Sequence, residues 1–326
     1  MLFRSIGGLI LGILVAALVS QSLRRELRSR YPWMAAAIAL LIWAPNLAWQ
    51  VVNGFPSLTY VTNHGGSIAS GGGVLVFLIE FGLYLSLLAP LWVAGMISIF
   101  RSRLLRPIGI ASAVPLVIFL FVGKSYYAAA TIPIAMAQGL MALSHVERRR
   151  LRSTLEIAVV AGSVLGFLVL LQLTLPITPA NRLHATGLDR TSELFADSVG
   201  WDDVAKQVTA IYRGLPAADR AQTVIISAYV GVPGALAIYG DPRLLPSVIS
   251  PQLTDFYWLP PHLTATSALM VDYTPSDVAW MCVSPQLITH LTVPYQVAGL
   301  EQGAPVTFCR LKAPIPQIWS QLRNFS

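Results

Sequence analysis

Three arginine-rich stretches divide the first half of this chain into apolar runs: RRELRSR (24–30), RSRLLR (101–106) and ERRRLR (147–152). Together they carry 11 arginines, and between Arg30 and Glu80 there is no Asp, Glu, Lys or Arg at all. An apolar run of about 20 residues is long enough for a helix to cross the ~30 Å hydrocarbon core of a bilayer. The pattern therefore predicts a polytopic membrane region.

The composition agrees with this reading. Of the 326 residues, 55% are hydrophobic and 11% are charged, against about 25% charged in soluble domains. Residues 1–176 hold 13 basic and 4 acidic side chains, whereas residues 177–326 hold 9 basic and 11 acidic ones. The excess of positive charge thus lies in short clusters between apolar runs and not on a soluble face, which argues against a nucleic-acid partner.

The apolar runs and the loops between them predict a topology of about six transmembrane helices in residues 1–176. Cytoplasmic loops retain Lys and Arg, so we expect the three arginine-rich loops to be cytoplasmic and residues 177–326 to lie outside the cytoplasm. A cleaved signal peptide at 1–23 is the weaker alternative, because the run is long and lacks a small-residue cleavage pattern. The expected helices cover residues 5–23, 33–51, 74–99, 107–122, 126–144 and 156–176.

Residues 177–326 predict a separate small α/β domain of about 150 residues, a common domain size. After a polar linker at 177–192 and a helix at 192–213, apolar segments predict strands, and 232–240 and 314–325 predict helices. Cys282 and Cys309 both fall in predicted strands on the oxidising side of the membrane, so a disulfide and two buried thiols both remain open. The expected strands are 223–228, 268–273, 278–283 and 306–311.

Candidate functional residues are few. No CxxC, HExxH or phosphate-binding loop occurs, so we expect no metal site and no cofactor. Lys124 is the only charged residue in the short outer loop 123–125. Together with Tyr126, Tyr127 and His64 it could bind a lipid phosphate. The simpler alternative is a lysine that extends its ammonium group to the membrane interface, beside tyrosines that anchor the helix there. Glu80 is a weak catalytic candidate, since an acid within the membrane is often functional, although at a helix end it could simply be hydrated.

Several segments resemble, in the same order, bacterial membrane glycosyltransferases of the dolichyl-phosphate-mannose-protein mannosyltransferase superfamily. The likeness begins with a proline, an asparagine, a Trp-Gln pair and an Asn-Gly-aromatic-Pro turn and extends over nearly the whole chain. It rests on APNLAWQVVNGFPSLTY (44–60), APLWVAGM (89–96), GKSYYAAATIPIAMAQG (123–139), YVGVPGALAIYG (229–240), LLPSVIS (244–250), FYWLPP (256–261), EQGAPVTFCR (301–310) and IWSQLR (318–323).

The resemblance implies a GT-C architecture and transfer of a sugar from a polyprenyl-phosphate donor to an acceptor on the outer face. It also implies that Lys124 lies near the lipid phosphate. In the family an Asp in the first large outer loop acts as general base, yet no Asp precedes Asp189 here, and the family's acid is absent from YVGVPG (229–234). The chain is thus expected to be the C-terminal part of such an enzyme, without its catalytic acid.

Two other functions are compatible with the sequence. The chain could be a non-catalytic membrane-anchored module whose outer domain binds a partner or a glycan. A transporter is the third reading, but the predicted helices show no internal repeat and no paired broken helices. If the glycosyltransferase reading holds, a second chain could supply the missing catalytic half.

The arginine distribution makes a testable prediction about topology. Reporter fusions at Ser326 should report a location outside the cytoplasm, and fusions within 147–152 should report a cytoplasmic one, because translocating clustered arginines is unfavourable. A cytoplasmic signal at Ser326 would contradict the predicted topology.

Overall fold

The computed structural model describes residues 2–64, 72–122, 125–175, 177–191, 193–241, 243, 247–297, 299 and 301–324. The chain forms two compact units, residues 1–171 and 172–326. The first is helical, and the second combines helices with a five-stranded mixed sheet.

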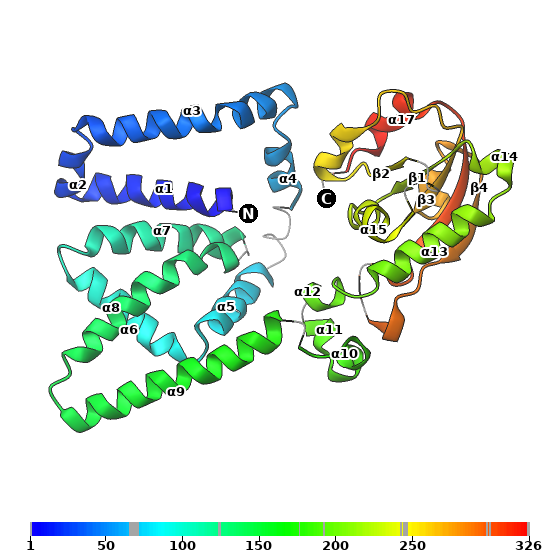
Figure 1. Cartoon of the computed structure of the whole chain (residues 1–326). Coiled ribbons are helices and arrows are strands. Elements are labelled where there is room, and N and C mark those ends of the chain that lie inside the picture. The colour runs from blue at the N-terminus through cyan, green and yellow to red at the C-terminus, as the bar shows by residue number, and fades with distance from the viewer. Residues whose placement is uncertain are drawn as a thin grey trace. The chain divides into compact units, whose positions relative to one another are not determined.

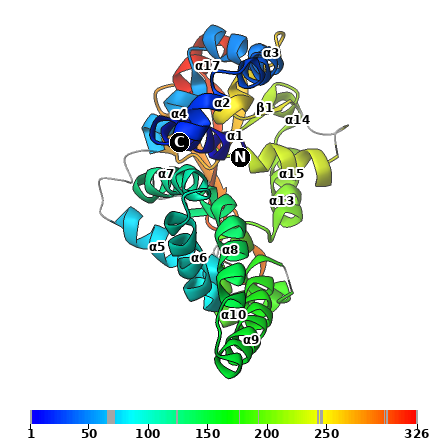
Figure 2. The ribbon, with the colours of Figure 1, turned by 90° about the vertical axis from the view of Figure 1, so that its left-hand side faces the viewer.

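The first unit consists of long apolar helices joined by short helical turns (Figures 1 and 2). Its α-helices are α1 (Leu2–Val19), α2 (Gln21–Glu26), α3 (Arg30–Val52), α4 (Pro56–His64), α5 (Gly72–Leu85), α6 (Ala89–Arg101), α7 (Arg106–Val122), α8 (Ile132–Ser144) and α9 (Arg149–Thr174). The 3-10 turns are η2 (Ser86–Leu88), η3 (Ser125–Tyr127) and η4 (Ala129–Thr131).

Within the described residues, four helical segments are long and apolar enough to cross a membrane: Arg30–Val52, Gly73–Arg101, Ser125–Ser144 and Arg149–Gln172. The membrane character of the unit is therefore supported. Two of the six expected helices are not among these four segments, because their apolar parts are shorter than 18 residues. Helix α7 has 17 residues, and the apolar part of α1 ends at Val19, where Ser20 begins the separate helix α2 by accepting a hydrogen bond from the Leu23 amide.

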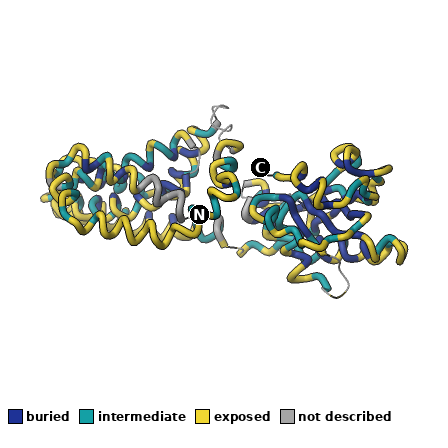
Figure 3. Tube along the Cα trace, turned by 90° about the horizontal axis from the view of Figure 1, so that it is seen from above, coloured by how far each residue is buried: buried dark blue, intermediate teal, exposed yellow. Residues whose placement is uncertain are grey.

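Apolar side chains of the first unit face outward. Helix α3 has no buried residue, and its Leu41 and Ile42 are 76% and 77% exposed. Figure 3 shows long exposed stretches over this unit and buried segments concentrated in the second. In water this surface would expose a large contiguous hydrophobic area, which soluble proteins rarely do. It is therefore suited to an apolar surrounding such as lipid.

Close approach of small residues joins the helices that do pack. Helix α1 lies along α7, and α6 lies along α8 (Figures 1 and 2). A Cβ added to Gly95 of α6 would lie 1.8 Å from the carbonyl oxygen of Ala135, and one added to Gly139 of α8 would lie 2.3 Å from that of Leu91. Small residues allow such contact between membrane helices, where van der Waals packing replaces the hydrophobic effect. The Gln138 amide also donates a hydrogen bond to Ser98 across this interface, at 3.1 Å.

The second unit begins with short helices and continues as an α/β arrangement. Its α-helices are α10 (Ala180–Thr186), α11 (Leu188–Thr191), α12 (Glu193–Ala196), α13 (Trp201–Gly214), α14 (Ala217–Arg220), α15 (Gly231–Tyr239), α16 (Pro275–Val278) and α17 (Ile315–Leu322). Its strands and 3-10 turns are β1 (Thr223–Ser227), β2 (Val248–Ile249), η5 (Leu253–Trp258), β3 (Ser267–Val271), β4 (Cys282–His290), η6 (Pro294–Gln296) and β5 (Pro305–Leu311).

The strands form one sheet in the order β2-β1-β3-β5-β4, with β1 parallel to β2 and β3, and β5 antiparallel to β3 and β4. All five residues of β1 and of β3 are buried, because the sheet carries a core on each face. Ile225 and Leu269 pack with residues of α13 and α15, whereas Val224 and Met270 pack with residues of α16 and α17. Continuous apolar strands are typical of sheets covered on both faces.

Several predicted boundaries in this unit were wrong. The expected linker 177–192 contains α10 and α11, and the expected helix 192–213 is divided into α12 and α13, which begins at Trp201. The expected strand 278–283 overlaps the end of α16, a turn stabilised by the capping box of Thr274 and Asp277, and β4 starts at Cys282. Local capping thus overrides the apolar pattern of VAWMCV (278–283). The helix predicted at 232–240, in contrast, is confirmed as α15.

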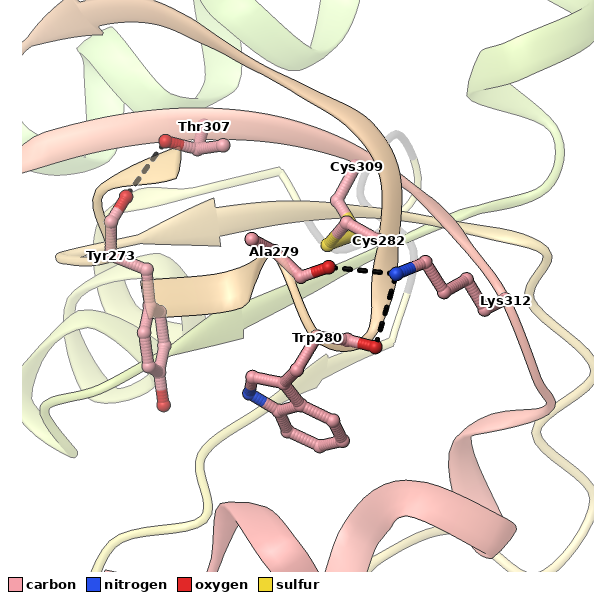
Figure 4. Close-up of a disulfide and its surroundings, with 7 residues drawn as sticks. All are labelled: Tyr273, Ala279, Trp280, Cys282, Thr307, Cys309 and Lys312. Carbon is pink, nitrogen blue, oxygen red and sulfur yellow. Dashed lines mark hydrogen bonds between the residues drawn. A yellow bond between two sulfur atoms is a disulfide. The ribbon is translucent and has the colours of Figure 1, made fainter. Parts of the chain in front are cut away.

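The disulfide between Cys282 and Cys309 is present (Figure 4). It joins the neighbouring antiparallel strands β4 and β5, with 5.3 Å between the two Cα atoms. Beside it, Lys312 Nζ donates hydrogen bonds to the carbonyl oxygens of Ala279 and Trp280, and Thr307 Oγ1 donates one to the Tyr273 carbonyl (Figure 4). These contacts attach β5 and the residue that follows it to the segment between β3 and β4.

The disulfide is expected to stabilise the second unit by about 3.5 kcal/mol, the chain-entropy value for a loop of this size. Chemical unfolding of the Cys282→Ser/Cys309→Ser double variant should show that loss relative to the oxidised wild type. Reductant should lower the stability of the wild type and leave the double variant unchanged. Equal stability of the oxidised wild type and the double variant would contradict the prediction.

Candidate functional site

The candidate site in the first unit centres on Glu80. This residue lies inside α5, eight residues after the helix begins at Gly72, which is about 12 Å along the axis. The Ser125 hydroxyl donates a hydrogen bond of 2.5 Å to Glu80 Oε2. Because Glu80 does not sit at the first turn of its helix, attraction to the helix N-terminus does not explain it.

Ser125 begins η3, the turn that connects to α8, and is fully buried. The hydrogen bond therefore joins two segments that are 45 residues apart in the sequence. The contact fixes the position of a carboxyl group directly beside the turn that follows Lys124.

An aromatic cluster packs next to this pair. Phe77 and Phe81, on α5 with Glu80, have ring centroids 5.6 Å apart, and Trp92 lies edge-on to Phe81 at 5.6 Å. Phe119 of α7 packs against Tyr127 at 5.1 Å. Three helical segments and η3 thus converge on one apolar layer beside the acid.

The two predicted tyrosines have different surroundings. Tyr127 is 6% exposed and belongs to the aromatic cluster, whereas Tyr126 is 38% exposed. Their rings lie 4.4 Å apart. Tyr126 is therefore accessible at the surface of the unit, whereas Tyr127 contributes packing to the aromatic cluster.

The two other predicted site residues are Lys124 and His64. Lys124 lies outside the described residues. His64 is the last residue of α4, and its side chain also lies outside them. No group of three or more His, Cys, Asp or Glu that could hold a metal ion occurs among the described residues. The described part of the site is therefore a carboxyl group, a buried serine and an aromatic layer.

Sequence reasoning missed Ser125 and Trp92. A serine in a loop carries no signal of its own, and its bond to Glu80 depends on how α5 and η3 pack. The Trp92 indole nitrogen is buried and has no hydrogen-bond partner among the described residues. A Trp in an apolar run indicates only a membrane helix or its interface, so this unpartnered donor beside Phe81 could not be anticipated.

Comparison with protein-family models, with curated proteins and with solved structures found no match for this chain.

The pairing of Glu80 with Ser125 makes a stability prediction. The Ser125→Ala variant should lower the free energy of unfolding in mixed micelles by roughly 1–3 kcal/mol, because it leaves a part-buried carboxyl oxygen without its donor, and a Glu80→Gln/Ser125→Ala cycle should show the coupling. The matched control is Ser98→Ala, which removes the neutral bond from Gln138 and should cost about 0.5–1.5 kcal/mol. Additive effects of the Glu80 and Ser125 substitutions would contradict the pairing.

Proposed function

We propose that this chain is the polyprenyl-phosphate-binding part of an integral-membrane glycosyltransferase of GT-C type that works on the outer face of a bacterial plasma membrane. The observation that carries the proposal is the contact of Glu80 with Ser125, which holds an acid at the turn following Lys124. An acid inside an apolar helix is unusual, because charges within a membrane are costly and are retained mainly for function.

The motif order from residue 44 to residue 323 supports the same proposal. The donor would be a polyprenyl-phosphate sugar whose phosphate lies against Lys124 and whose tail follows the exposed apolar helices. Six membrane crossings and a second unit outside the cytoplasm are part of the proposal, as the arginine distribution supports. Glu80 stays a candidate for proton transfer, since the family's general base has no counterpart at its usual place in this sequence.

The proposal predicts that Lys124 contributes to lipid-phosphate binding. One charge-assisted contact contributes about 1.5–3 kcal/mol, so Lys124→Ala should weaken binding of undecaprenyl phosphate by the purified chain roughly 10- to 150-fold. Binding is measured with radiolabelled lipid in detergent micelles.

Two variants complete the experiment. Lys124→Arg keeps the charge and should retain most of the affinity, whereas the control Lys206→Ala removes an exposed lysine of α13 that is paired with Asp202 and should bind like the wild type. Unchanged affinity of Lys124→Ala would leave Lys124 as an interfacial anchor and remove the basis for a donor site here.

A further inference from the structure

One edge of the sheet in the second unit gathers acidic and aromatic side chains. Strands β1 and β3 are parallel neighbours, so their carboxyl ends lie at the same edge, where open α/β sheets commonly bind ligands. Tyr229 follows β1 by two residues and Asp272 directly follows β3. The Asp272 amide donates a hydrogen bond to the Pro305 carbonyl, at the start of β5, and Glu301 lies four residues before that strand.

Glu301 is the buried member of the group. It is 4% exposed, and its Oε2 atom has no hydrogen-bond partner in the part of the chain that the structure describes. Buried carboxylates are normally paired or hydrogen-bonded. Burial, and then the charges of Asp272 and Asp197, raise the pKa of Glu301 to about 7.

An aromatic pair borders the same carboxylates. The rings of Trp201 and Tyr229 stack with centroids 6.0 Å apart, and the indole nitrogen of Trp201 donates a hydrogen bond of 2.6 Å to the Asp197 carbonyl. A Cβ at Gly231 would lie 2.3 Å from Trp201 Cη2, so glycine is required for the ring to reach this turn. Burial raises the pKa of Tyr229, and the charges of Asp197 and Glu301 add to this effect.

The backbone at the rim is also unusual. Asp272 has φ of +63°, in the left-handed region that side chains other than glycine seldom adopt. Strained residues of this kind cluster at ligand sites. In this conformation the exposed carboxylate of Asp272 stays at the edge of the sheet near Glu301.

We propose that this edge, with Glu301 as its floor, Asp272 and Asp197 at its rim and the Trp201–Tyr229 pair as its wall, binds an organic cation with an ammonium group. Neither Asp272 nor Glu301 forms an ion pair with a described basic side chain. A cation relieves the repulsion among the carboxylates, which a neutral sugar does not, and aromatic faces attract ammonium groups. The described residues contain no group of side chains suited to a metal ion, which favours an organic ligand.

The site has a definite pH dependence. The pKa of Glu301 is higher in the folded chain than its ordinary value of 4.5, so between pH 4.5 and about 7 the folded state binds more protons than the unfolded state. The stability of the second unit should therefore fall as the pH rises through this window. Cation binding needs the carboxylate, so affinity should rise over the same range as Glu301 loses its proton.

The experiment uses the full chain in nanodiscs and choline as the probe, whose charge does not change with pH. Its uncharged isostere dimethylbutanol and the neutral sugar glucose are the comparison ligands, and binding is followed by saturation-transfer NMR. Choline should bind more tightly at pH 8 than at pH 5.5, and the isostere should not bind. Glu301→Gln should weaken choline binding roughly tenfold or more, the loss of one charge-assisted contact, and should abolish the pH dependence.

The control variant is Asp203→Asn, which removes a carboxylate on α13 near Lys206 and should bind choline like the wild type. Thermal unfolding provides a second readout, because Glu301→Gln should remove the loss of stability between pH 4.5 and 7. Equal binding of choline and its isostere, or unchanged choline affinity in Glu301→Gln, would overturn the proposal. Binding of glucose without binding of choline would instead assign the edge to a neutral ligand.

Discussion

The cost of placing charge in hydrocarbon is the constraint on which the first unit depends. It places 11 of the 12 arginines of this unit in three short stretches and leaves helix α3 without a buried residue. Since lipid tails solvate such side chains as well as a protein core does, hydrophobic burial cannot hold these helices together. Contact between backbones takes over this role, as at Gly95 and Gly139, where no larger residue fits.

The second unit follows the opposite rule. Its core forms by removing apolar side chains from water, and both faces of β1 and β3 are covered. The disulfide of Cys282 and Cys309 adds a covalent link to the two strands that lie on the antiparallel side of the sheet. The parallel side has no such link and carries instead the edge where Tyr229, Asp272 and Glu301 gather.

The two units share one chemical feature, a carboxyl group placed where solvation is poor. Glu80 has a serine donor that compensates part of the cost, whereas one oxygen of Glu301 has no donor among the described residues. A buried acid with a partner stabilises the fold and can also serve chemistry. One without a partner is a more direct sign that a ligand completes the site, because an unpaired buried carboxylate opposes folding.

Much of the architecture followed from sequence alone. Charge spacing indicated the membrane unit and its arginine loops, the strands β1 and β5 were located to within a residue, and a bridge between Cys282 and Cys309 was among the two alternatives. These features are local, since the length of an apolar run, the preference of a turn and the type of a residue act over a few positions. The same reasoning failed at 278–283, where the cap at Thr274 starts a helical turn.

Tertiary structure alone decided which distant residues meet. Ser125 reaches Glu80 across 45 residues, Tyr127 turns into an aromatic layer while Tyr126 stays accessible, and Glu301 lies beside charges from separate segments at the edge of the sheet. No local pattern encodes these encounters, because they depend on the packing of whole helices and on the order of strands in the sheet. Sequence determined which segments could enter a membrane or a core, and packing determined which polar groups became partners there.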